Sequence, residues 1–228
     1  MPARAKIVLV LALAVLSGCD YVLGLQRHVD AGVLGDGTNP TIDAPKICFE
    51  DYFLGSELDI VVWTYVGNNS RISIGTNAEL VFRFLTTTTT LGEAGIRTQS
   101  EIELRDTAVL GLLLERPVAN TETAMRIVKA GVPVYQIRVT SDSQLHMLVG
   151  ALEVGTAAAV NNQYLQIRSD GSDVVFGHSV DGVKFIETRV PAATPFGMMQ
   201  LELSASSTGA ITTSSDVVWD RLTVTCPP

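Results

Sequence analysis

Two glutamates, Glu101 and Glu103, alternate with apolar residues in the segment EIELRD at positions 101–106. Side chains two positions apart on a strand share a face, so both carboxylates would point the same way. Two carboxylates about 5 Å apart are what retaining glycoside hydrolysis needs, one as acid and one as nucleophile. However, Arg105 follows on the same face, and no aromatic residue stands within the segment to stack on a sugar. We interpret the segment as a solvated strand face with an ion pair, and keep Glu101 and Glu103 as the catalytic candidates of an alternative hypothesis.

The histidines of the chain are His28, His146 and His178, and their spacing matches neither H-x-H nor H-E-x-x-H. We therefore predict no metal ligands. His178, Ser179 and Asp181 have the residue types of a hydrolytic triad. Neighbours on a strand point to opposite faces, however, so His178 cannot act as the base for Ser179. The sequence favours a hairpin at these positions.

Calcium is the one cofactor that the sequence suggests, because four aspartates lie in or near expected turns. They are Asp170, Asp173, Asp181 and Asp216. Calcium loops have alternating oxygen ligands, as in D-x-D-x-D-G, and the chain lacks this pattern. Aspartate also favours turns on its own account. The sequence therefore predicts no cofactor, with calcium in these loops as the alternative.

Residues 1–18 have the pattern of an export signal. Arg4 and Lys6 precede ten consecutive apolar residues at 7–16, fewer than the roughly 20 that span a bilayer. The motif Leu16-Ser17-Gly18-Cys19 resembles the lipobox of bacterial lipoproteins. The resemblance implies cleavage before Cys19, whose thiol would carry a diacylglycerol and whose amine would be fatty-acylated. The alternative is an ordinary secretory leader cut after Ala14, which would leave Cys19 as an unpaired thiol.

Residues 19–46 are predicted to form a lipidated, flexible tether. They contain several glycines and prolines and show no sustained period of two or 3.6 residues. A coil of this length spans on the order of 25 to 30 Å, enough to hold a domain clear of the lipid headgroups. We expect an exported protein of the cell envelope, anchored to the inner or the outer membrane.

The composition and charge of the chain limit the classes of partner that it can bind. Charged residues make up 18% of the 228 residues, the net charge is −8, and no cluster of Lys and Arg is present. A protein that binds nucleic acid needs a basic face to replace the counterions of the phosphates. We therefore exclude nucleic acid as a partner, and expect membrane contact through the lipid anchor.

Residues 47–228 are predicted to form one all-β domain, a sandwich of two antiparallel sheets. Apolar residues recur at every second position, as with Leu165 and Ile167 or with Leu222 and Val224, and no stretch sustains a helical period. The dipeptides at 170–171 and 181–182 are both Asp-Gly, which suits tight hairpin turns. The expected strands lie near 79–86, 96–105, 108–115, 124–129, 134–140, 144–149, 163–168, 173–179, 183–189, 198–204 and 217–225. Many short strands with frequent turns are typical of a sandwich.

Two cysteines, Cys48 and Cys226, remain once Cys19 is assigned to lipid. An exported protein meets an oxidising compartment, so we predict that they form a disulfide. The bridge would place the first and last strands side by side. Two buried free thiols are the alternative.

Several segments resemble the concanavalin A-like lectin/glucanase superfamily, a jelly-roll group that includes laminin-G-like modules. The segments are Phe49-Glu50-Asp51-Tyr52-Phe53, Leu58-Asp59 with Trp63, Ile167-Arg168, Val174-Val175-Phe176, Ser179-Val180-Asp181-Gly182-Val183-Lys184-Phe185 and Asp220-Arg221-Leu222-Thr223-Val224. The resemblance implies a jelly roll. These motifs shape turns and core, so they imply a fold rather than a function. Arg105 stands where the glucanases of this group carry a third acid.

The function expected is that of a membrane-anchored, non-enzymatic recognition or structural module of the cell envelope, with carbohydrate or protein as its ligand class. Lectin-like sugar binding depends on exposed rings. Trp63, expected near the sandwich edge, and Trp219, expected in the closing strand, are instead interpreted as structural, which weakens the case for a lectin. The alternative hypothesis is a glycoside hydrolase of the jelly-roll glucanase type.

Overall fold

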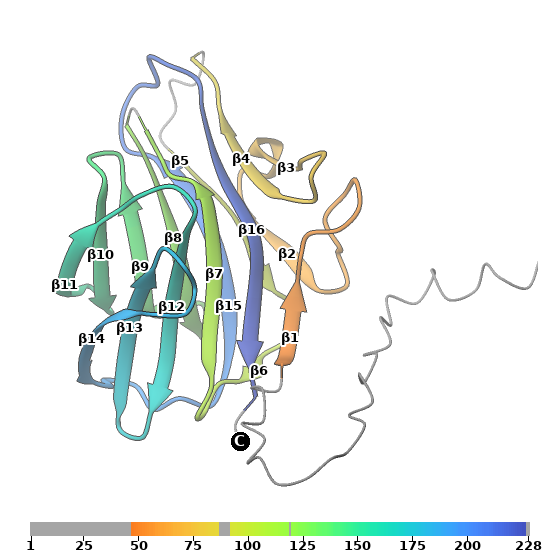
Figure 1. The fold of residues 1–228 in the computed structure, drawn as a ribbon. Helices are drawn as coiled ribbons and strands as arrows, with labels where there is room; N and C mark the ends of the chain where they lie inside the picture. The colour runs from red at the N-terminus through yellow and green to blue at the C-terminus, as the bar shows by residue number, and fades with distance from the viewer. Residues whose placement is uncertain (1–46, 87–91, 119, 227–228) are drawn as a thin grey trace, which may run out of the picture. The chain divides into compact units, whose positions relative to one another are not determined.

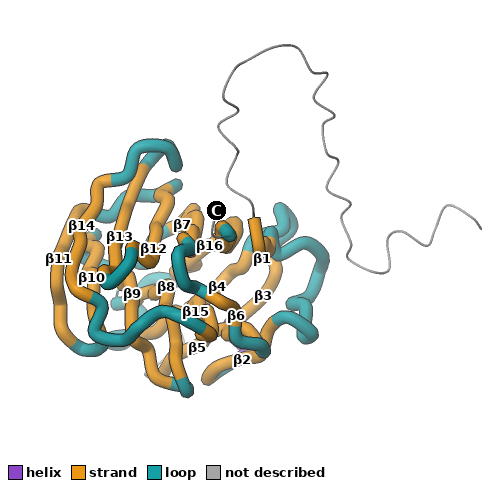
Figure 2. Tube along the Cα trace, turned by 90° about the horizontal axis from the view of Figure 1, so that it is seen from below, coloured by secondary structure: helices purple, strands orange, loops and turns teal. Residues whose placement is uncertain are grey.

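The computed structural model describes residues 47–86, 92–118 and 120–226, and within them it has two antiparallel sheets. Sheet A contains, in spatial order, β14 (Ile186–Pro191), β13 (Asp173–Ser179), β12 (Gln163–Asp170), β7 (Ala108–Glu115), β16 (Ser215–Thr225), β4 (Leu80–Phe84) and β3 (Ile72–Ile74), with β1 (Ile47–Asp51) also paired to β16. Sheet B contains β11 (Leu152–Ala158), β10 (Gln144–Val149), β9 (Val132–Thr140), β8 (Thr121–Lys129), β15 (Met198–Ser207), β5 (Gly92–Thr98) and β2 (Trp63–Gly67), with β6 (Ile102–Glu103) paired to β15. The two sheets lie face to face (Figures 1 and 2). The predicted all-β sandwich is confirmed.

The helical content of the described residues is one 3-10 turn, η1 (Asn69–Arg71). The side chain of Asn68 begins this turn by accepting a hydrogen bond from the Ser70 N–H at 3.1 Å. Within the described ranges, no helix is long and apolar enough to cross a membrane.

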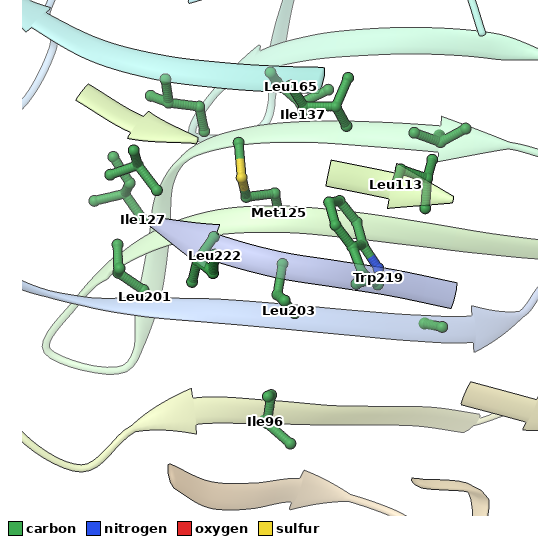
Figure 3. Close-up of a cluster of buried hydrophobic side chains, with 14 of the residues drawn as sticks. Ile96, Leu113, Met125, Ile127, Ile137, Leu165, Leu201, Leu203, Trp219 and Leu222 are labelled. Atoms are coloured by element: carbon green, nitrogen blue, oxygen red, sulfur yellow. The ribbon is translucent and has the colours of Figure 1, made fainter. Parts of the chain in front are cut away.

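The core lies between the sheets and is built by the alternating apolar residues of each strand. Figure 3 shows Trp219 from sheet A beside Met125 from sheet B, within a cluster of buried aliphatic side chains. A Cβ atom at Gly111 would come within 2.9 Å of both the Met125 sulfur and the Trp219 ring, so this strand position needs a glycine. The Trp219 Nε1–H donates to Thr123 Oγ1 at 3.1 Å, which satisfies the polar atom of the indole inside the core.

Both tryptophans are structural, as predicted. Trp63 and Trp219 are 1% and 0% exposed. The Trp63 Nε1–H donates to the Asp51 carboxylate, which ties β2 to the end of β1. Neither indole ring is therefore available to stack on a ligand.

The first and last described strands are neighbours, as the cysteines predicted. β1 pairs antiparallel with β16, with Phe49 opposite Val224 (Figure 1). A disulfide joins Cys48 to Cys226, with Cα atoms 5.0 Å apart. The bridge closes a segment with a sequence separation of 178 residues.

The strand predicted at 96–105 is wrong in extent. β5 ends at Thr98, and the chain resumes in the two-residue strand β6, which pairs with the start of β15. The ladder of β5 with β15 has its last pair at Arg97 and Glu202, and the Gln99 N–H then donates to the Val62 carbonyl next to β2. A continuous alternating pattern thus covers two strands and a turn.

The predicted two-residue turn at Asp181-Gly182 is also wrong, although the turn at Asp170-Gly171 is close to the prediction. Gly171 has a φ of +63° in a two-residue loop that follows Asp170. Gly182 has a φ of +71°, but Asp181 is not in the positive-φ region that a type I′ turn requires of both residues. β13 ends at Ser179 and β14 starts at Ile186, so the connection is a longer loop.

Candidate functional site

The outer face of sheet B carries a cluster of charged side chains on its central strands β5, β15 and β8. β15 lies between the other two, and the register places Glu202 between Arg97 of β5 and Arg126 of β8. Glu93 lies on the same face of β5, four residues from Arg97. The alternation that buries Leu201 and Leu203 in the core is what turns Glu202 outward. We call Glu93, Arg97, Arg126 and Glu202 the Arg126 cluster.

Arg126 connects the two carboxylates of the cluster. Its Nη1 donates to Glu202 Oε1 at 2.7 Å and also to Glu93 Oε1. Arg97 Nε donates to the other oxygen of Glu202 at 2.8 Å. The Glu202 side chain is 1% exposed, and those of Arg126 and Arg97 are 16% and 21% exposed. Each oxygen of the buried carboxylate therefore has an arginine donor.

The electrostatics of the cluster favour the charged form of Arg126. Burial lowers the pKa of Arg126, but the charges of Glu93 and Glu202 and their hydrogen bonds more than offset it, and the pKa is raised overall. The guanidinium therefore stays protonated, and both glutamates face a fixed positive charge. Two carboxylates on one arginine nitrogen can be no more than about 5–6 Å apart, which is near the separation that retaining hydrolysis uses. Here an arginine lies between them.

The residues beside the cluster on this face are small or polar, apart from the buried Val128. Gly95, Ser204 and Ala124 form a row of small residues on β5, β15 and β8. The next carboxylate, Glu122, accepts a hydrogen bond from Ser206 Oγ at 3.0 Å and lies 3.8 Å from Arg138. None of the outward residues of β5, β15, β8 and β9 is aromatic. These strands thus offer a ligand hydrogen-bonding groups but no stacking platform.

Glu101 and Glu103 lie away from this cluster. Glu101 precedes β6 and Glu103 ends it, and both are exposed. Glu103 Oε1 accepts a hydrogen bond from the Arg105 N–H at 2.9 Å, which caps the following turn. The two residues occur at the edge of a two-residue strand rather than along a central strand.

His178 and Ser179 have separate partners. His178 Nδ1 lies 3.2 Å from Gln163 Nε2, whereas Ser179 Oγ donates to Asp181 Oδ1 at 2.8 Å. His146 Nδ1 lies 2.6 Å from Glu153 Oε2. His178 and Ser179 thus bind different groups.

The aspartates considered for calcium make ion pairs or hydrogen bonds with protein groups. Asp170 pairs with Arg168 and Arg189, and Asp173 pairs with Arg189. Asp216 makes a two-pronged pair with Arg83. No three His, Cys, Asp or Glu side chains in the described part of the chain are grouped to hold a metal.

Asp181 fixes the β13–β14 loop through its side chain. Its Oδ1 accepts hydrogen bonds from the N–H groups of Val183 and Lys184, at 2.9 Å each, and from Ser179 Oγ. These bonds lower the pKa of Asp181 to about 2. They also explain why the loop is wider than a type I′ turn, since the side chains of Ser179 and Asp181 supply the bonds that a tight turn would make between backbone groups.

Cys19 and His28, with the whole leader and tether, lie outside the described residues. Glu93 and Glu202 were not among the residues singled out from the sequence. The signal for Glu202 is present, because Gln200, Glu202, Ser204 and Ser206 alternate with apolar residues along one strand.

No protein-family model and no curated protein matches this sequence. Solved structures do match the fold. The catalytic domain of an endo-1,3-β-glucanase (laminarinase) from Thermotoga petrophila has a TM-score of 0.63 at 10% identity, covering 81% of this chain and 98% of that chain. The β-glucanase of Bacillus licheniformis has a TM-score of 0.57 at 10% identity, covering 78% and 97%.

A structure from Mycobacterium tuberculosis is also similar. That protein is described as an immunostimulatory antigen and pseudo β-1,3-glucanase, with a TM-score of 0.61 and 13% identity over 78% of this chain and 98% of that chain. The domain thus has the jelly-roll β-sandwich fold of these structures. Identity at this level establishes the fold alone.

Proposed function

We propose that this chain is a lipid-anchored, non-enzymatic recognition or structural module of the bacterial cell envelope. The Arg126 cluster is the observation that supports the non-enzymatic part of this proposal. Glu93 and Glu202 are the outward carboxylates that lie close together on sheet B, and both bind Arg126. The arginine occupies the space between them.

Retaining hydrolysis requires one carboxyl that gives up a proton and one carboxylate that attacks the sugar. The acid must hold its proton near neutral pH, which needs burial or a neighbouring negative charge. Glu202 is buried, and both of its oxygens accept hydrogen bonds from arginines. Glu93 binds the same Arg126 nitrogen through Oε1. Both carboxylates are therefore occupied by arginine rather than placed to act on a sugar.

A jelly-roll glycoside hydrolase is the second candidate, and the glucanases among the similar structures support it at least as well as a binding role. Assay of the purified chain on a panel of β-1,3- and β-1,4-glucans separates the two. Release of no reducing sugar supports the binding module. Turnover that disappears in Glu103→Gln, or in Glu93→Gln with its fold intact by circular dichroism, would establish the hydrolase instead.

The anchor is a separate part of the proposal and rests on the lipobox-like motif that ends at Cys19. Several acyl chains contribute about 0.8 kcal/mol for each buried methylene, so attachment would be stable. Cys19→Ser should abolish metabolic labelling with palmitate and trap the chain as its precursor or release it. Cys48→Ser is the matched control, because it changes a cysteine of the folded domain and should keep the label. An unlabelled wild-type chain that still fractionates with membranes would refute the anchor.

A further inference from the structure

A cavity of about 190 Å³ lies at one edge of the sandwich, away from the Arg126 cluster. It is lined by Ala158, Val160, Gln163, His178, Ser179, Val180, Lys184 and Ile186. These residues come from the end of β11, the start of β12 and the β13–β14 hairpin. The edge strands β11 and β14 of the two sheets lie side by side there (Figures 1 and 2).

The walls of the cavity expose an unusual amount of aliphatic surface. Val160, Val180 and Ile186 are 41%, 72% and 69% exposed. Val183, in the same loop as Val180, is 80% exposed. Exposed aliphatic side chains that gather around one cavity, rather than scattering singly, indicate a contact with something apolar.

The lining of the cavity includes a hydrogen-bond donor, which is identified from its partners. Gln163 Oε1 accepts from the Val160 N–H at 3.0 Å, so the amide oxygen is committed and Nε2 must face His178. An amide nitrogen is a donor, so His178 Nδ1 accepts. Burial lowers the pKa of His178, in keeping with a neutral ring. The ring proton is then on Nε2, which hydrogen-bonds to none of the described residues.

Lys184 adds a positive charge, and it forms no ion pair with any described residue. The nearest acid in the loop, Asp181, is turned to its own backbone, where Oδ1 binds the N–H groups of Val183 and Lys184. Gly182 lies against the Tyr164 ring, which holds the loop from the other side. The loop that carries Val180 and Lys184 is therefore fixed in place, and the site is preformed.

We propose that this cavity binds a small aliphatic carboxylate, with the carboxylate at His178 Nε2 and the Lys184 ammonium and the hydrocarbon against Val160, Val180 and Ile186. An apolar cavity of about 150 Å³ holds benzene, so this one has room for about six to eight heavy atoms. Binding of such a ligand leaves the Arg126 cluster untouched. The inference is independent of the proposed function.

The test uses the whole chain with isotope-labelled histidine, titrated with hexanoate and followed by NMR. Only three histidines are present, and the His178→Gln spectrum assigns the relevant signal. We expect the His178 signal to shift saturably, with a dissociation constant of roughly 1 mM, while the His146 signal stays in place. Lys184→Gln should weaken binding about threefold to tenfold, and Lys129→Gln, at the exposed end of β8, should not change it.

Three outcomes would overturn the proposal. The first is the absence of a saturable shift at His178. The second is binding of hexanol as tight as that of hexanoate, because the site would then recognise no charge. The third is tighter binding of N-acetylleucine than of hexanoate, which would assign the cavity to the carboxyl end of a peptide.

Discussion

Arg126→Met tests whether the Arg126 cluster stabilises sheet B. Methionine keeps much of the apolar stem and removes the donors to Glu202 and Glu93. A hydrogen bond to a buried charged group contributes about 1.5–3 kcal/mol. The bond to Glu93, whose side chain is 37% exposed, adds at most about 1 kcal/mol. Glu202 keeps Arg97, which limits the loss, so we expect the free energy of unfolding to fall by about 2–4 kcal/mol and Tm by about 4–16 °C.

Denaturant unfolding and calorimetry measure this change. Arg83→Met is the matched control, because Arg83 makes a two-pronged pair with Asp216 but its side chain is 55% exposed, so its loss should cost less than about 1 kcal/mol. The double variant Arg126→Met with Glu93→Gln should be no less stable than Arg126→Met alone, since the second change removes an unpaired carboxylate. Equal costs for Arg126→Met and Arg83→Met would refute the reasoning.

Three further changes test other parts of the fold. Cys48→Ala opens a loop of 178 residues and should lower the free energy of unfolding by about 4–5 kcal/mol, which is measured as a lower Tm. An unchanged Tm would show that the disulfide does not stabilise the domain. Gly182→Val places a Cβ within 3.1 Å of the Tyr164 ring at a backbone φ of +71°. Denaturant unfolding should show a loss of stability of about 1–3 kcal/mol. Gly197→Val, at a position with open space around it, should cost less. Asp181 has a pKa of about 2 in the folded chain against about 3.9 in the unfolded chain, so its stabilisation is present above pH 4 and is lost as the pH falls toward 2. Asp181→Asn should therefore reduce the change of Tm with pH over that range. Plots of Tm against pH that run parallel for the variant and the wild type would contradict this.

The fold could be predicted because the residue patterns that identify its strands are local in the sequence. Alternation at Leu165 and Ile167 identifies a strand with one buried face, and both residues are fully buried. The even pair of cysteines predicted the pairing of the chain ends. The β13–β14 loop was mispredicted because its shape depends on where the side chains of Ser179 and Asp181 make their hydrogen bonds. The dipeptide alone does not carry that information.

The Arg126 cluster escaped prediction for a topological reason. The alternation of apolar and polar residues predicts that Glu202 points outward, but it does not predict which strands lie beside it. β15 lies between β5 and β8, so Glu202 meets Arg97 and Arg126 from positions 105 and 76 residues earlier in the chain. A search for acids along one strand finds Glu101 and Glu103, which the structure leaves at the edge of β6. Acids that approach each other across strands, each on its own strand with an arginine between them, become visible only when the order of the strands is known.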